Sequence, residues 1–254
     1  MIHKKVIVII IQLLLVISFF VIWEYFASKN IINSFIFSSP SRILKCILNF
    51  PKTELINHIL ITLKEIFISF TLSIIIGFIF ALLLYEVPIL FKILEPFLTI
   101  LNSAPKVALG PLMIIMFGAK DTSIIIMALS ITLVINILSI HSGFCKSDSS
   151  LAKLLTSLNA SKYDQFVHLT LPSAYQTIIS SLKINISMTL IGVIMGEFLV
   201  SKAGIGYLII YGTQVFNLTL VMSGIVILII ISYVLYLIIS VVEKLVNKKI
   251  SNES

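Results

Sequence analysis

The stretch LTSLNASKYDQFVHLTLPSAYQ (residues 155–176) is a polar interruption between two long apolar runs. Just before and within its start, apolar residues recur at helical spacing, at Leu151, Leu154, Leu155 and Leu158. Asn159 then tolerates the left-handed backbone conformation that ends many helices. Ser161 is suited to cap a new short helix over about 162–170, with Asp164 favourable in its first turn. The stretch therefore predicts a helix, a sharp corner and a second, short helix.

The remainder of the chain has the composition of a membrane protein. It has 254 residues, of which 59% are hydrophobic and 11% charged, and its mean hydropathy is +1.14. Soluble domains carry about one quarter charged residues. A helix needs about 20 apolar residues to cross a bilayer. Runs of this kind lie near residues 6–26, 66–85, 97–117, 122–140, 179–200 and 218–242. We therefore expect an all-α integral membrane protein with six transmembrane helices.

The first apolar run, residues 6–26, is expected to be a retained helix and not a cleaved signal peptide. It is longer than the apolar core of a signal peptide, and no small-residue cleavage site follows it. The run ends on Trp23, Glu24 and Tyr25, and aromatic residues of this kind favour the membrane interface. We therefore count this run among the six spans.

The formal net charge of +7 does not predict a nucleic-acid surface, because no basic cluster is interleaved with aromatic residues. The positions of the basic residues instead indicate the orientation of the chain in the membrane. If the N-terminus is cytoplasmic, nine lysines lie inside and seven basic residues lie outside, a weak positive-inside bias. Four of the inside lysines lie near the termini: Lys4, Lys5, Lys248 and Lys249.

We interpret residues 1–254 as a single transmembrane domain in the cell membrane, in contact with lipid on its outer faces. Both termini and residues 144–178 are expected in the cytoplasm, whereas residues 28–57 and 201–217 are expected outside. The two cysteines, Cys46 and Cys145, then lie on opposite sides of the membrane, so no disulfide joins them.

The opening stretch carries a recognisable spacing. Nine residues separate Asn159 from LTLP at 169–172. This resembles the EAA loop, the signature cytoplasmic loop of binding-protein-dependent ABC importer permeases, which reads E-A-A-x-x-x-G, nine residues, then I-x-L-P. Lys153, Leu154 and Leu155 stand where Glu-Ala-Ala is usual, and Asn159 stands at the glycine. Asn accepts a positive φ more readily than other non-glycine residues, so we expect the corner to survive.

Four further segments resemble permeases of the nitrate, sulfonate and taurine type, in the same order along the chain. SSPSRIL (38–44) is similar to the S-P-S segment after their first helix. HILITLKEIFISF (58–70) is similar to H-x-x-x-S-L-x-R-x-x-x-G-F at the start of their second helix. APKVALGPLMIIMFG (104–118) and GEFLVSKAGIGYLI (196–209) resemble parts of their third and fifth helices.

The resemblance implies a MetI-like permease subunit of an ATP-driven ABC importer. Two copies of the chain would form the pore, two ABC ATPase subunits would dock underneath, and an extracytoplasmic solute-binding protein would deliver a small solute. The branch suggests nitrate, a sulfonate or taurine, and the alternatives are a thiamine-precursor pyrimidine or riboflavin. The chain has no G-x-x-x-x-G-K-[ST] loop, so we expect a separate subunit to hydrolyse ATP. No catalytic, cofactor or metal site is expected.

The resemblance assigns ATPase coupling to the short helix and its corner. Tyr163 and Phe166 lie one turn apart, and we interpret them as an aromatic pair that anchors the docked helix. The competing interpretation is that both rings lie back on the membrane surface. The predicted coupling residues are Leu158, Asn159, Ala160, Ser161, Tyr163, Asp164, Phe166, Leu169, Leu171 and Pro172.

Polar residues inside the spans are the candidates for a translocation path, because such groups face a cavity or each other. We assign Asn102, Ser103 and Glu197 to this path, although a structural helix contact explains Glu197 equally well. For Asn136 and Asn185 we favour interhelical hydrogen bonds. In addition, Gly192 and Gly196 form a G-x-x-x-G motif typical of close helix packing.

Two unrelated classes of protein are alternatives, an intramembrane enzyme and a secondary transporter. An enzyme needs clustered titratable groups, but the four histidines are scattered without a paired serine or metal-ligand spacing. A secondary transporter favours repeated halves, and the chain has no convincing internal repeat. The histidines in question are His3, His58, His141 and His168.

Overall fold

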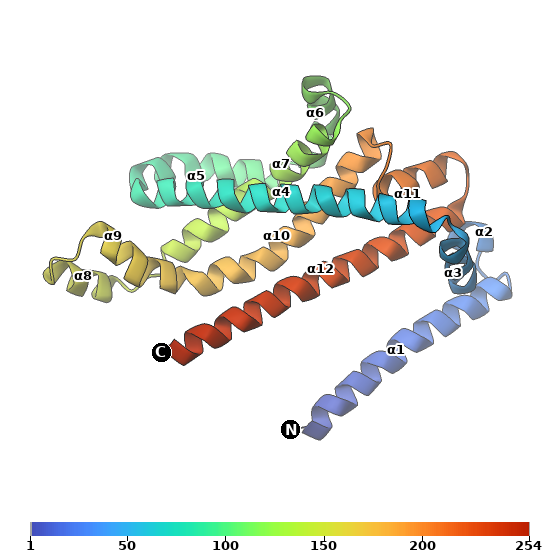
Figure 1. Ribbon diagram of the computed structural model, residues 1–254, viewed down its shortest axis with the longest axis horizontal. Helices are drawn as coiled ribbons and strands as arrows, with labels where there is room; N and C mark the ends of the chain where they lie inside the picture. The colour runs from blue at the N-terminus through green and yellow to red at the C-terminus, as the bar shows by residue number, and fades with distance from the viewer. Residues whose placement is uncertain (1, 254) are drawn as a thin grey trace. The chain divides into compact units, whose positions relative to one another are not determined.

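The computed structural model describes residues 2–253, with side chains described for residues 7, 8 and 10–246. The side chains of Lys4, Lys5, Lys248 and Lys249 lie outside this part. Within residues 2–253 all regular secondary structure is helical (Figure 1). The helices are α1 (Ile2–Ser28), α2 (Ser34–Phe37), α3 (Pro40–Asn49), α4 (Lys52–Glu86), α5 (Pro88–Ser103), η1 (Lys106–Leu109), α6 (Gly110–Phe117), α7 (Asp121–Phe144), α8 (Ser149–Ser157), α9 (Lys162–Gln165), η2 (Phe166–Thr170), α10 (Leu171–Val200), α11 (Ile205–Gln214) and α12 (Leu218–Glu253).

Five helical segments are long and apolar enough to cross a membrane, and they coincide with five of the six predicted spans. They are Ile10–Ser28, Lys52–Glu86, Asp121–Phe144, Lys162–Val200 and Leu218–Val246. A helix satisfies its own backbone hydrogen bonds, which is why long apolar segments adopt this structure in lipid. The all-α membrane architecture predicted from composition is therefore confirmed.

The third predicted span, residues 97–117, is not one straight helix. α5 ends at Ser103, and the η1–α6 segment leaves it at an angle of 85°. Pro105 has no backbone N–H and pushes the preceding residue out of the helical region, and Ala104 accordingly has extended torsions (φ −66°, ψ 142°). The apolar run thus forms a broken span, and the prediction of a continuous helix was wrong.

The chain forms two compact units. The first comprises Met1–Leu60 and Ala203–Ile229, and the second comprises Ile61–Lys202 and Ile230–Ser254. Polar contacts hold the first unit together around the start of α3. Glu24 of α1 accepts hydrogen bonds from the Ser41 amide (2.9 Å) and hydroxyl (2.8 Å).

Close packing of α7 against α10 forms the core of the second unit. A Cβ added to Gly192 would lie 2.6 Å from the Cα of Ala128, and one added to Gly196 would lie 2.9 Å from the Cα of Ile124. Only glycine permits the two backbones to approach this closely. The packing role predicted for the G-x-x-x-G motif is confirmed.

A buried chain of polar side chains joins α4, α7 and α10 in the second unit. The Asn136 amide donates a hydrogen bond to the Ser73 hydroxyl (2.5 Å), and the Asn185 amide donates one to the Asn136 carbonyl oxygen. Both asparagines and Ser73 are almost completely buried. The predicted interhelical bonding of the two asparagines is confirmed.

Candidate functional site

The corner before the short helix has the geometry that the sequence predicts. Asn159 has a positive φ of 59°. Its amide donates to the Thr156 carbonyl (3.0 Å), and the Ala160 amide donates to the Leu155 carbonyl (3.0 Å). These two bonds satisfy carbonyl groups that the end of α8 would otherwise leave free, which is the Schellman arrangement. Asn159 therefore adopts the left-handed backbone conformation expected of the glycine in the loop pattern.

The short helix α9 begins with the predicted cap. The Ser161 hydroxyl accepts a hydrogen bond from the Asp164 amide (3.1 Å), and the Asp164 carboxylate accepts one from the Ser161 amide (3.0 Å). Reciprocal bonds of this kind satisfy two amides at the helix start. Gln165 also donates to Thr156 (3.2 Å), which ties α9 back to α8 across the corner.

The short helix continues into the membrane span without a second corner. The chain passes from α9 through the π-helical turn η2 directly into α10, so that Lys162–Val200 forms one extended helical segment. Pro172 lies in the first turn of α10, where its missing N–H is compatible with a local π-type widening. Figure 1 shows α8 and α9 at the end of α10. A displacement of α9 would therefore pass along a single helix.

The two aromatic side chains of the short helix have different surroundings. Tyr163 is 74% exposed. The Phe166 ring instead lies 5.5 Å from the ring of Phe144 and 6.3 Å from that of Tyr85. Phe144 is fully buried, and the half-buried Phe166 packs against the core that contains it. Sequence spacing could not distinguish the two because both positions follow the cap at helical intervals.

The other predicted coupling residues also fall into an outer and an inner group. Leu158, at the end of α8, is 69% exposed, whereas Leu169 is 8% exposed. Next to Leu169, the Thr170 hydroxyl shares a hydrogen bond with the Tyr85 hydroxyl (3.1 Å). The inner group thus fixes the loop to the ends of α4 and α7, and Leu158 and Tyr163 are left on its surface.

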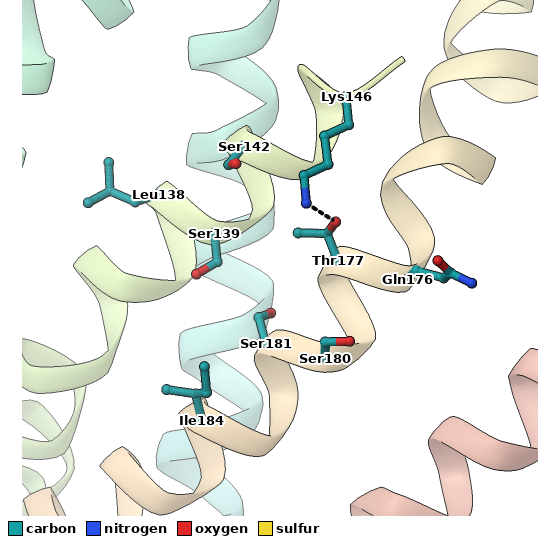
Figure 2. A pocket seen from close by; sticks show the side chains of 9 residues that line it. All are labelled: Leu138, Ser139, Ser142, Lys146, Gln176, Thr177, Ser180, Ser181 and Ile184. Atoms are coloured by element: carbon teal, nitrogen blue, oxygen red, sulfur yellow. Dashed lines mark hydrogen bonds between the residues drawn. The ribbon is translucent and has the colours of Figure 1, made fainter. Parts of the chain in front are cut away.

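A polar groove of about 600 Å³ lies between α7 and α10, near the loop (Figure 2). Lys146, just beyond α7, donates a hydrogen bond to the Thr177 hydroxyl (3.0 Å). Ser142 and Ser180 are exposed in this groove. Hydrocarbon offers no hydrogen-bond partners to such a surface. The lining residues are Leu138, Ser139, Ser142, Lys146, Gln176, Thr177, Ser180, Ser181 and Ile184.

The coupling and path residues predicted from the sequence do not include the residues that line this groove. A signal was present, because Ser139 and Ser142 are three residues apart before the loop, and so are Thr177 and Ser180 after it. Residues three apart lie on one face of a helix. Two polar faces that flank one loop would therefore have predicted a shared polar surface.

The three residues predicted for the translocation path lie in different environments. Asn102 and Ser103 are exposed at the end of α5, directly before the bend. Glu197 is 1% exposed and accepts a hydrogen bond from the Thr62 hydroxyl (2.6 Å). Within this chain Glu197 is a contact between α10 and α4.

Comparison with known proteins identifies the family. The model of the binding-protein-dependent transport system inner membrane component matches residues 73–252. The chain belongs to this family. A probable ABC transporter permease of Haemophilus influenzae is 30% identical, over 88% of this chain and 91% of that protein. The formylaminopyrimidine transport permease of Halalkalibacterium halodurans is 25% identical, over 74% of each chain. A putative aliphatic sulfonates transport permease of Bacillus subtilis is 24% identical, over 81% of this chain and 75% of that protein.

The fold agrees with this membership. One chain of a structure of the MetNI methionine ABC transporter in an inward-facing conformation superimposes with a TM-score of 0.65 at 17% identity, covering 76% of this chain and 96% of that one. The predicted MetI-like arrangement is confirmed. The chain is a multi-pass permease subunit of an ABC importer, and separate ATPase subunits hydrolyse ATP. The interpretations as an intramembrane enzyme or a secondary transporter are thereby excluded.

Proposed function

We propose that two copies of this permease enclose the translocation path and that the groove between α7 and α10 lines its inner end. The groove supports this proposal because its hydroxyls and Lys146 form an open polar surface that lipid cannot solvate. Asn102 and Ser103, exposed at the bend after α5, would line another part of the path. Two ATPase subunits dock on the loop, and an extracytoplasmic binding protein delivers the solute.

The test of this path is the accessibility of single cysteines. In a background that lacks Cys46 and Cys145, we expect Ser142→Cys and Ser180→Cys to react with a water-soluble thiol reagent at least about tenfold faster than a lipid-facing control. Ile191→Cys is the matched control, because Ile191 lies on α10 with Ser180 and its side chain is exposed on the single chain. Equal rates at all three positions would contradict a water-filled groove.

We propose that residues 144–178 and both termini face the cytoplasm, and that residues 28–57 and 201–217 face outward. The lysine bias and the loop resemblance support this orientation. The groove then lies at the cytoplasmic end of the path, because Lys146 and Thr177 fall within residues 144–178. Residues 1–254 form one permease domain in this proposal.

Labelling of the native cysteines tests the orientation. A membrane-impermeant maleimide applied to intact cells should label Cys46, which is half-buried, and should not label Cys145, which is exposed but cytoplasmic. Partial desolvation raises the pKa of the Cys145 thiol, so intact and permeabilised cells are labelled at the same pH. Permeabilised cells, in which both sites should react, are the control. The reverse pattern in intact cells would refute the orientation.

We propose a small anion as the solute, such as nitrate, a sulfonate or taurine. Lys146 supplies a cationic group, and the surrounding hydroxyls donate hydrogen bonds of the kind that bind oxyanions. The relative that transports formylaminopyrimidine supports a pyrimidine as the second candidate, and riboflavin is a third. Thermal stabilisation of the partner binding protein by each compound would distinguish them. Stabilisation by the pyrimidine or by riboflavin alone would exclude the anion.

A further inference from the structure

Two glutamates from different helices are buried together in the second unit. Glu65 of α4 and Glu197 of α10 are each 1% exposed. Thr62, one helical turn before Glu65, donates its hydroxyl hydrogen bond to Glu197 (2.6 Å). Residues three apart lie on one helix face, so Thr62 and Glu65 are presented to α10 together. The Glu197 carboxyl lies within hydrogen-bonding reach of Glu65.

The charged groups that face Glu65 do not neutralise it. The nearest charged groups facing Glu65 are Lys64 on its own helix, Asp121 on α7 and Glu197 on α10. Lys64 forms an ion pair with Asp121 (3.5 Å), and both side chains are largely exposed to the outside of the fold. Asp121 adds a further negative charge. A cationic partner therefore does not account for the burial of the Glu65 carboxyl group.

Electrostatics then limits the pair to one negative charge. An unpaired buried carboxylate costs several kcal/mol, and two carboxyl groups that share a site do not both ionise. The hydrogen bonds decide which group is neutral. Glu197 accepts a bond from Thr62, whereas both carboxyl oxygens of Glu65 meet no donor among the described residues. Glu65 is therefore the carboxyl group that carries a proton, and in this neutral form it can donate a hydrogen bond.

We propose that Glu65 and Glu197 form a proton-binding site in which protonated Glu65 donates a hydrogen bond to the Glu197 carboxylate and joins α4 to α10. On the orientation proposed above, the site lies toward the outer end of the spans.

A hydrophobic carbodiimide tests whether the proton is present, because such reagents modify protonated carboxyl groups in apolar surroundings. In membranes that contain the complete importer, dicyclohexylcarbodiimide at neutral pH should form an adduct on Glu65, identified by peptide mass. Raising the pH should abolish the adduct. Exposed Asp121 should remain unmodified throughout. Absence of an adduct on Glu65 at neutral pH would overturn the proposal, and this readout does not depend on the solute or on transport.

The pH dependence of unfolding provides the second test. Because the folded state needs the proton and the unfolded state does not, the wild-type complex should lose stability as the pH rises. For each pH unit, the folded-to-unfolded ratio of the wild-type complex should fall by up to about tenfold more than that of Glu65→Gln. The glutamine amide still donates a hydrogen bond but has no proton that titrates. Glu65→Arg should behave like Glu65→Gln, and Asp121→Asn should behave like the wild type. Identical pH profiles for wild type and Glu65→Gln would overturn the proposal.

Discussion

Replacement of Gly192 by leucine is expected to destabilise the permease and to reduce the amount that assembles. A Cβ at this position would lie 2.6 Å from the Cα of Ala128 and 3.1 Å from its Cβ. The backbone of α7 cannot yield as a flexible side chain would, so α7 and α10 must separate. Overpacking costs up to about 3 kcal/mol, which corresponds to a decrease of about 100-fold in the folded-to-unfolded ratio. The measurement is the amount of protease-resistant permease in the membrane.

Ile191→Leu is the matched control for this substitution. Ile191 is the neighbouring residue on α10 and is 45% exposed, so a change of its shape leaves the contact with α7 intact. We expect this variant to accumulate as the wild type does. Normal abundance and uptake of Gly192→Leu would contradict the close approach of the two helices.

Tyr163→Asp is expected to uncouple transport while the permease still inserts at normal abundance. Tyr163 is 74% exposed, and the capped helix that carries it is continuous with α10. On the proposed docking, the substitution removes an aromatic contact with the ATPase and introduces a buried charge. Loss of an interface hot spot costs about 2 kcal/mol or more, which is about 30-fold in affinity. Uptake and the ATPase content of the solubilised complex measure the effect.

Two further variants separate docking from folding at this helix. Tyr163→Phe keeps the ring and should retain uptake and ATPase content. Phe166→Asp should instead reduce the amount of folded permease, because Phe166 packs against the buried ring of Phe144. If Tyr163→Asp keeps its full ATPase content and uptake, the coupling function of this surface is wrong.

The amino-acid sequence by itself determined the features that depend on neighbours along the chain. Long apolar runs predicted six spans, and five of them are single helices, because a helix in lipid satisfies its hydrogen bonds within the segment. The corner at Asn159 and the cap of Ser161 with Asp164 were predictable for the same reason, since their bonds join residues no more than five apart. The bend after Ala104 was equally local, because Pro105 is its cause, although hydropathy alone concealed it.

Tertiary structure decided the features that depend on which faces meet. The inward direction of Phe166 required Phe144 and Tyr85 from other helices, and the polar groove required α7 and α10 to lie side by side. The juxtaposition of Glu65 with Glu197 could not be predicted, because either residue alone is compatible with an ion pair or an aqueous path. Helical periodicity specifies the face on which a side chain lies, but the packing of helices determines what that face contacts, and the contact sets whether a buried carboxyl group holds its proton.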